Sequence, residues 1–98
     1  MIPDIEQRFN QLRDKWLQET MFLSSSTAIA NNENLKKIVL MGEAVLPYIL
    51  HDLELTHHHW FSALFEITGE DPVDKNDRGN IAKMTEKWVE WGRLHNYL

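Results

Sequence analysis

Histidines are the residues of this sequence whose spacing first raises the question of chemistry. His57, His58 and His59 are consecutive, and His51 precedes them on what reads as a helix. Imidazole is a common metal ligand, but zinc needs three or four ligands that converge on one point. Successive helical residues point about 100° apart, so these imidazoles should diverge. We therefore expect the tract to occupy the first turn of a helix that begins after Thr56, with no metal and no cofactor.

A metal-dependent enzyme is nevertheless the alternative that the sequence leaves open. It would use His51 together with the run His57–His59, if the helix continued unbroken between them. His51, Glu54 and His58 would then share one face, at i, i+3 and i+7. We rank this alternative second because Thr56 reads as a helix cap, which implies a break between them.

A calcium-binding loop is only superficially matched. With Asp74 as position 1, Asn76 and Gly79 fall at positions 3 and 6. A cation, Arg78, then stands at position 5, and Thr85 stands at position 12, where the site needs a bidentate glutamate. The segment instead reads as an acidic loop before the last helix.

Other catalytic patterns fail for lack of context. Two acidic pairs occur, Glu70 with Asp71 and Asp74 with Asp77, but only Val73 among their neighbours could desolvate a carboxyl group. The serines of 24–26 have no glycine-rich elbow, and the four glycines are too dispersed to cradle a phosphate. We therefore predict that the protein is not an enzyme.

Charge is distributed unevenly along the chain, whose formal net charge is −5. Residues 43–77 carry eight acidic side chains against one lysine. Such a segment would repel nucleic acid, which is bound through clustered Lys and Arg. An acidic segment is typical either of a solvated surface or of a contact with a basic protein. We expect a protein partner with a basic surface, with no nucleic acid and no membrane.

Tryptophan is frequent, with four in 98 residues. Most of these rings should be buried, because a small domain without disulfides needs the apolar area. Tryptophan is also enriched at the centres of interfaces, so a surplus ring could contact a partner. The residues that we assign to partner binding are Glu70, Asp71, Asp74, Asp77, Trp88 and Trp91.

Apolar side chains recur at steps of three and four, which predicts helices throughout. The first stripe includes Ile2 and Ile5, with Pro3 suited to the helix start, and should end near Met21. Residues 22–34 should form a loop with one short helical turn. Further helices are predicted over 33–41, 43–54, 57–68 and from about Asn80 to the end. No segment has the alternation of a strand.

The size and composition indicate one soluble domain, residues 1–98. There is no cysteine, which is typical of a reducing compartment. No apolar run approaches the roughly 20 residues of a membrane span, and the first residues lack the features of a signal peptide. We expect a cytoplasmic protein.

One stretch resembles a unit of a HEAT-like helical repeat: IVLMGEAVLPYILHDLEL, residues 38–55. The following WFSALFEITGEDP, with Trp88 and Trp91, resembles the continuation of such proteins. Over residues 35–95 the chain also looks like small bacterial proteins of unknown function that share an HWF, ITG, PV and WG pattern. The resemblance implies a helical scaffold that binds proteins.

These observations predict an all-α fold, a compact bundle of four to five helices containing a HEAT-like helical hairpin. The function that they favour is a non-enzymatic protein–protein interaction module. By analogy with small acidic bacterial or phage proteins, its role would be that of an antitoxin or an inhibitor acting through an acidic surface. Self-association into a homodimer is left open.

Overall fold

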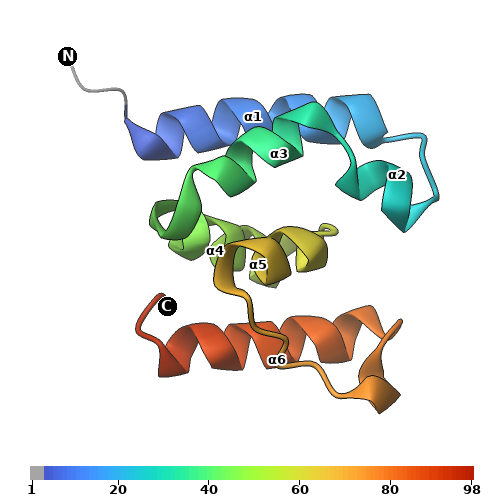
Figure 1. The fold of residues 1–98 in the computed structure, drawn as a ribbon, viewed down its shortest axis with the longest axis vertical. Helices are drawn as coiled ribbons and strands as arrows, with labels where there is room; N and C mark the ends of the chain where they lie inside the picture. Colours follow the sequence, from blue (N-terminus) through green and yellow to red (C-terminus); the bar gives the residue numbers. More distant parts are fainter. Residues whose placement is uncertain (1–3) are drawn as a thin grey trace.

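The protein is helical throughout the part of the chain that the structure describes, as Figure 1 shows. The computed structural model describes residues 4–98, except for the side chain of Ser26. Ile2 and Pro3, which we predict to begin the first helix, lie outside these residues. The α-helices are α1 (Ile5–Thr20), α2 (Ser26–Ala30), α3 (Glu33–Leu40), α4 (Leu46–Thr56), α5 (Phe61–Thr68) and α6 (Ile81–Leu94), and two 3-10 helices are η1 (Gly42–Val45) and η2 (Lys75–Asp77). No strand forms within residues 4–98, so the predicted all-α class is confirmed.

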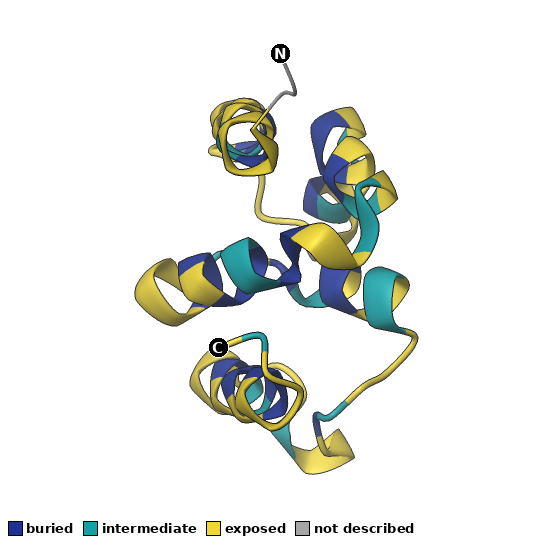
Figure 2. Ribbon diagram, turned by 90° about the vertical axis from the view of Figure 1, so that its left-hand side faces the viewer, coloured by how far each residue is buried: buried dark blue, intermediate teal, exposed yellow. Residues whose placement is uncertain are grey.

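The helices form three layers. In Figure 1 α1 lies beside α3 at the top, α4 and α5 cross the middle, and α6 forms the bottom layer. Helix α3 packs mainly on α1 and α5, whereas α4 packs mainly on α6. In Figure 2 the buried faces of all three layers point toward the middle of the molecule. The middle layer therefore carries the contacts that hold the outer two together.

Aromatic rings fill the centre of the core. The predicted stripe of α1 is buried at Phe9, Leu12 and Trp16. Trp60, immediately before α5, is fully buried between α1 and the middle layer, with ring centroids 5.5 Å from Phe9 and 4.6 Å from Trp16. Aromatic pairs at these distances add to the free energy gained by burying their area. The inward position predicted for Trp60 is confirmed.

The helix ends follow ordinary capping chemistry. Asp4 accepts a hydrogen bond from the backbone N–H of Glu6 at the start of α1, and Asn80 accepts one from Lys83 at the start of α6. Gly69 ends α5 with φ of 71°, a conformation that glycine adopts without strain. These local signals place the helix boundaries close to those that the sequence predicts.

The histidine run is where the prediction is wrong. We expected a helix starting at Thr56 and continuing through the imidazoles, but α4 runs on to Thr56, and α5 begins only at Phe61. His57 turns the chain with φ of 60°. The cause is the polar side chain of Thr56, which donates to the carbonyl oxygen of Asp52 at 2.7 Å and so closes the last turn of α4.

This turn yields a prediction on stability. A left-handed residue other than glycine is strained, so His57→Gly should raise the free energy of unfolding by about 0.5–1 kcal/mol. The control is His51→Gly, an exposed position inside the same helix, which should lower it by about 1 kcal/mol. Urea unfolding followed by circular dichroism measures both variants. Effects of the same sign would contradict the assignment of the turn.

Candidate functional site

The most heavily bonded polar group of the described chain is the carboxylate of Asp52 on α4, a residue only 9% exposed. Its Oδ2 accepts hydrogen bonds from Nε1 of Trp60 at 2.7 Å and from Nδ1 of His58 at 2.8 Å. The hydroxyl of Thr56, which donates to the backbone carbonyl of Asp52, lies 3.2 Å from the same oxygen. A guanidinium nitrogen of Arg13 on α1 lies 3.6 Å from Oδ1. We call these five residues the Asp52 cluster. It joins α1, α4 and the segment that leads into α5.

The Asp52 cluster sets the orientation of one imidazole. An ionised carboxylate only accepts, so Nδ1 of His58 carries a hydrogen, and in the neutral ring Nε2 is then an acceptor. The same pairing orients the general base of many hydrolases. The depression that His58 adjoins is also lined by Thr20, whose hydroxyl donates to the carbonyl of Trp16 at 2.7 Å. That hydroxyl is engaged in its own helix, so the cluster reads as a structural one.

The remaining histidines do not assemble a metal site. His51 and His57 are exposed on α4 and at its end, and His59 is exposed on the way to α5. Within residues 4–98, no three His, Asp or Glu side chains are grouped so that they could hold an ion. The alternative of a metal-dependent enzyme therefore finds no ligand set in the described chain.

The acidic residues that we assign to partner binding lie together on the connection from α5 to α6. Asp71 pairs with Arg78 at 3.1 Å, and its other carboxylate oxygen accepts from the backbone of Val73 at the same distance. Glu70 and Asp74 are exposed, and Asp77 is half-buried. The connection is thus partly fixed by its own ion pair and carries further carboxylates at the surface.

The two tryptophans assigned to partner binding lie in the core instead. Trp88 is 1% exposed and Trp91 is 7% exposed, with their ring centroids 5.4 Å apart on α6. Trp91 is further covered by the C-terminal residues, because Tyr97 and His95 stack on it. Neither ring is exposed in the described chain, so we base no proposal on either one.

The exposed aromatic residues are different ones, and our reading of the sequence missed them. Phe22, between α1 and α2, is 91% exposed, and Phe65 on α5 is 53% exposed. Met21 and Leu23, on either side of Phe22, are exposed as well. The signal that could have found Phe22 is its place beyond the α1 stripe, in a run of apolar residues that leads into a serine-rich loop.

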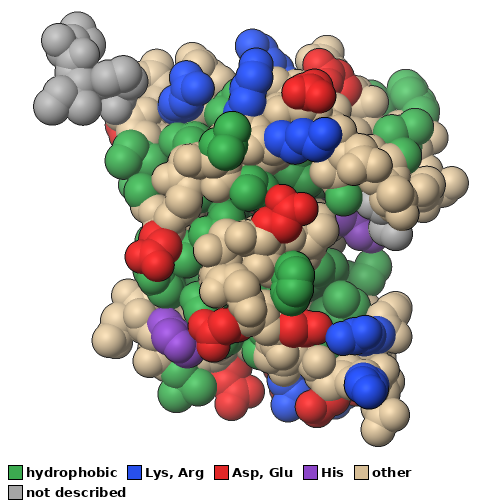
Figure 3. All heavy atoms as spheres, in the orientation of Figure 1, with side chains coloured by type: hydrophobic (Ala, Val, Ile, Leu, Met, Phe, Trp, Pro, Cys, Tyr) green, Lys and Arg blue, Asp and Glu red, His purple; other side chains and the backbone are tan. Residues whose placement is uncertain are grey.

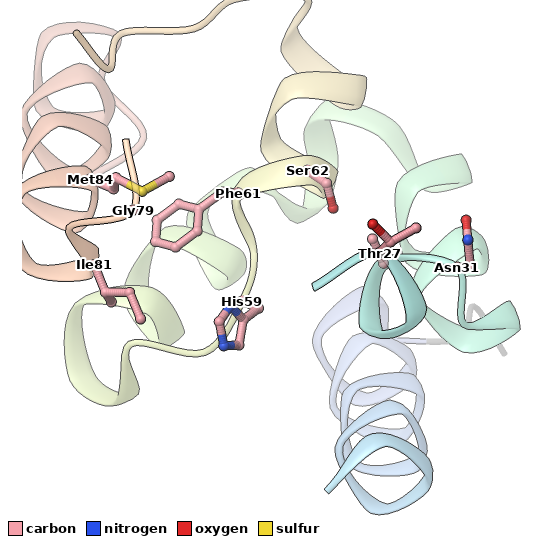
Figure 4. A pocket seen from close by; sticks show the side chains of 9 residues that line it. Thr27, Asn31, His59, Phe61, Ser62, Gly79, Ile81 and Met84 are labelled. Carbon is pink, nitrogen blue, oxygen red and sulfur yellow. The ribbon is translucent and has the colours of Figure 1, made fainter. Parts of the chain in front are cut away.

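A cleft of about 540 Å³ opens between α2, the start of α5 and the start of α6. Figure 4 shows an apolar wall of Phe61, Ile81 and Met84 on one side and the polar side chains of Thr27 and Asn31 on the other. In Figure 3 the molecule narrows on its right-hand side between these regions, and hydrophobic side chains gather there. An apolar lining with a few polar groups is typical of binding sites.

Two smaller depressions adjoin this cleft. One, of about 270 Å³, shares Phe61, Ser62 and Met84 with it and extends to Phe65 on α5. The other, of about 300 Å³, shares only His59 and extends to Met21 and Leu23. The shared residues fix their order, with the 540 Å³ cleft in the middle. We call the three depressions together the α2–α6 groove.

Comparison with family models, with curated proteins and with solved structures gives no match to this chain. None of the helices in residues 4–98 is long and apolar enough to cross a membrane. The function is therefore argued from the Asp52 cluster and the α2–α6 groove.

The Asp52 cluster yields a second prediction on stability. Asp52→Ala would leave the buried indole N–H of Trp60 without an acceptor, so we expect a loss of about 3 kcal/mol in the free energy of unfolding. Asp52→Asn keeps one acceptor oxygen and should lose less. Urea unfolding followed by tryptophan fluorescence measures the loss. The control, Asp74→Ala at an exposed position, should stay within about 0.5 kcal/mol; equal losses for the two alanine variants would rule out the role of Asp52.

Proposed function

We propose that the protein is a non-enzymatic protein–protein interaction module that binds its partner along the α2–α6 groove. The observation that carries this proposal is the groove itself, in which a mainly apolar cleft shares lining residues with two smaller apolar depressions. An isolated exposed apolar side chain is ordinary on a protein surface, whereas a contiguous apolar area is typical of an interface.

Exposed apolar side chains at both ends of the groove support the proposal. Met21 and Leu23 border one end, next to Phe22, and Phe65 borders the other. Aromatic residues and methionine are enriched in the cores of protein interfaces. A partner that covers these side chains would remove their apolar area from water, which contributes roughly 25 cal/mol per Å² before the costs of association.

The carboxylates on the connection from α5 to α6, of which Asp71 lines the smallest depression, favour a partner with a basic surface. Asp71 is paired with Arg78, but Glu70, Asp74 and Asp77 form no ion pair within residues 4–98. Carboxylates at the rim of an apolar contact speed association with a basic protein and disfavour acidic ones. With such a surface, the role that we propose is that of an antitoxin or an inhibitor that binds a basic protein.

The resemblance to HEAT-like repeats and to small bacterial proteins supports the same class of function. HEAT-like proteins act as scaffolds for other proteins, and we propose that this likeness extends to the present chain. The segment that carries the resemblance spans α3 and α4, which are joined through η1 but pack mainly on other helices, α3 on α1 and α5 and α4 on α6.

Substitution at the mouth of the groove tests the proposal. Ile81→Asp puts a charge where we expect an apolar contact, so it should weaken a captured partner complex at least tenfold, or about 1.4 kcal/mol. The fold should survive, because Ile81 is exposed and an acidic residue in the first turn of α6 is favourable. The measurement is affinity capture from the source cells, with mass spectrometry and titration of the captured protein.

The matched control is Ala82→Asp, the next residue of α6, which is exposed and does not line the groove. It should retain the partner as the unchanged protein does. Loss of the partner from both variants, or from neither, would count against the groove as the binding surface. Light scattering on the purified chain measures whether it forms a homodimer, in which a second copy could cover the groove.

A further inference from the structure

We infer that the middle cleft of the α2–α6 groove is a binding site for an uncharged small molecule with a flat apolar body and an amide or hydroxyl group at one end. This site goes beyond the proposed function and does not require it, because the ligand would fill the cleft of about 540 Å³ alone. Three observations carry the inference: the size of the cleft, the lack of charge in its described lining, and the separation of its apolar and polar walls.

The size of the cleft suits a small molecule. Its volume of about 540 Å³ lies within the range of roughly 300–1,000 Å³ that is usual for such sites, whereas the adjoining depressions measure about 270 and 300 Å³. The lining comes from α2, from the start of α5 with His59 before it, and from the start of α6 with Gly79 before it. A molecule in the cleft is therefore contacted from several elements, as Figure 4 shows.

Charge is missing from the described lining of this cleft. Asp, Glu, Lys and Arg make up 26% of the chain, but none of the nine lining residues is one of them. The adjoining depression that shares Phe61 includes Asp71 and Arg78, and these two side chains pair with each other at 3.1 Å. An ionised ligand would lose hydration without meeting an unpaired opposite charge, which is costly. The lining therefore favours an uncharged ligand over an anion or a cation.

The apolar and polar side chains of the cleft lie on opposite walls. Figure 4 shows Phe61, Ile81 and Met84 on one wall, and Thr27 and Asn31 on the other. A flat apolar body suits the first wall, because an aromatic ring and a thioether pack well against another ring. An amide or hydroxyl group suits the second, because the amide of Asn31 both donates and accepts. The ligand should thus lie with its polar group toward α2.

The polar side chains of the cleft are not used by the fold. Ser25 and Asn32 accept hydrogen bonds from backbone N–H groups at the starts of α2 and α3, and His58 is bonded to Asp52. By contrast, four polar side chains that line the cleft form no hydrogen bond with the described atoms of the chain: Thr27, Asn31, His59 and Ser62. Their donors and acceptors are available to a ligand.

Three probes of one shape test the inference on the unchanged chain: β-naphthamide is uncharged, β-naphthoate is an anion and β-naphthamidine is a cation. They are titrated by NMR at about pH 8, where imidazole is ordinarily neutral. The amide should bind with a dissociation constant below about 1 mM, which a molecule of its size can reach. The two ions should bind about fivefold or more weakly, because the lining offers them no counter-charge. Nuclear Overhauser effects from the naphthyl protons should reach the methyl groups of Ile81 and Met84.

Variants of the protein locate the bound probe. Thr27→Asp adds a carboxylate to the polar wall, at an exposed position in the first turn of α2 where an acid is favourable. It should tighten the binding of naphthamidine about fivefold and leave naphthoate weak. Ser62→Tyr fills the cleft from an exposed position of α5 and should weaken naphthamide about fivefold or more. The control Gln11→Tyr, exposed on α1, should bind naphthamide as the unchanged chain does. Circular dichroism checks that each variant is folded.

Several results would overturn the inference. These are equal affinity for the three probes, tighter binding of either ion to the unchanged chain, contacts of the naphthyl ring outside the cleft, or an affinity for naphthamide that Ser62→Tyr leaves unchanged. The outcome is separate from that of the proposed function. If naphthamide fails to bind while Ile81→Asp still releases a captured partner, the small-molecule site is rejected and the interaction module stands. If naphthamide binds as expected and no partner is captured, the site stands without the proposed function.

Discussion

The buried carboxylate of Asp52 holds the corner between α4 and α5 and faces α1: Oδ2 accepts from His58 and Trp60, and Oδ1 lies 3.6 Å from a guanidinium nitrogen of Arg13. Burying a charge is costly unless donors surround it, and here an indole and an imidazole N–H both reach Oδ2. The bond from Trp60 is the most consequential, because it fixes the direction of a fully buried indole on which Phe9 and Trp16 pack. An apolar residue in place of Asp52 could fill the space, but it could not select one orientation of the ring.

That orientation also determines where the groove lies. The chain leaves α4 at His57, is held at His58 by the carboxylate, and enters α5 immediately after Trp60. His59 and Phe61, on either side of the anchored indole, line the middle cleft. The hydrogen bonds from His58 and Trp60 to Asp52 therefore position these two lining residues of the groove. A shift of this corner would move both residues at once.

The periodic helices were predictable from the sequence, and the corner between them was not. The stripe of α1 predicts the burial of Phe9, Leu12 and Trp16 because helical spacing is a local property. The position of the histidines depends on hydrogen bonds to Asp52 from residues up to eight positions later, and on a guanidinium from another helix. Local spacing also could not show how Trp91 is covered. The apolar stripe of α6 predicts an apolar face, but the side chain that stacks on Trp91 is Tyr97, which follows the end of the helix.

The groove could not be predicted from the sequence, for a related reason. It is assembled from the end of α1 and the start of α2, from the entry into α5, and from the start of α6, which are separated by intervening helices. Each segment alone carries a few apolar residues of the kind that most surfaces contain. Only the layered packing brings these segments together around adjoining depressions. The acidic connection is visible in the sequence, whereas the depressions required the fold.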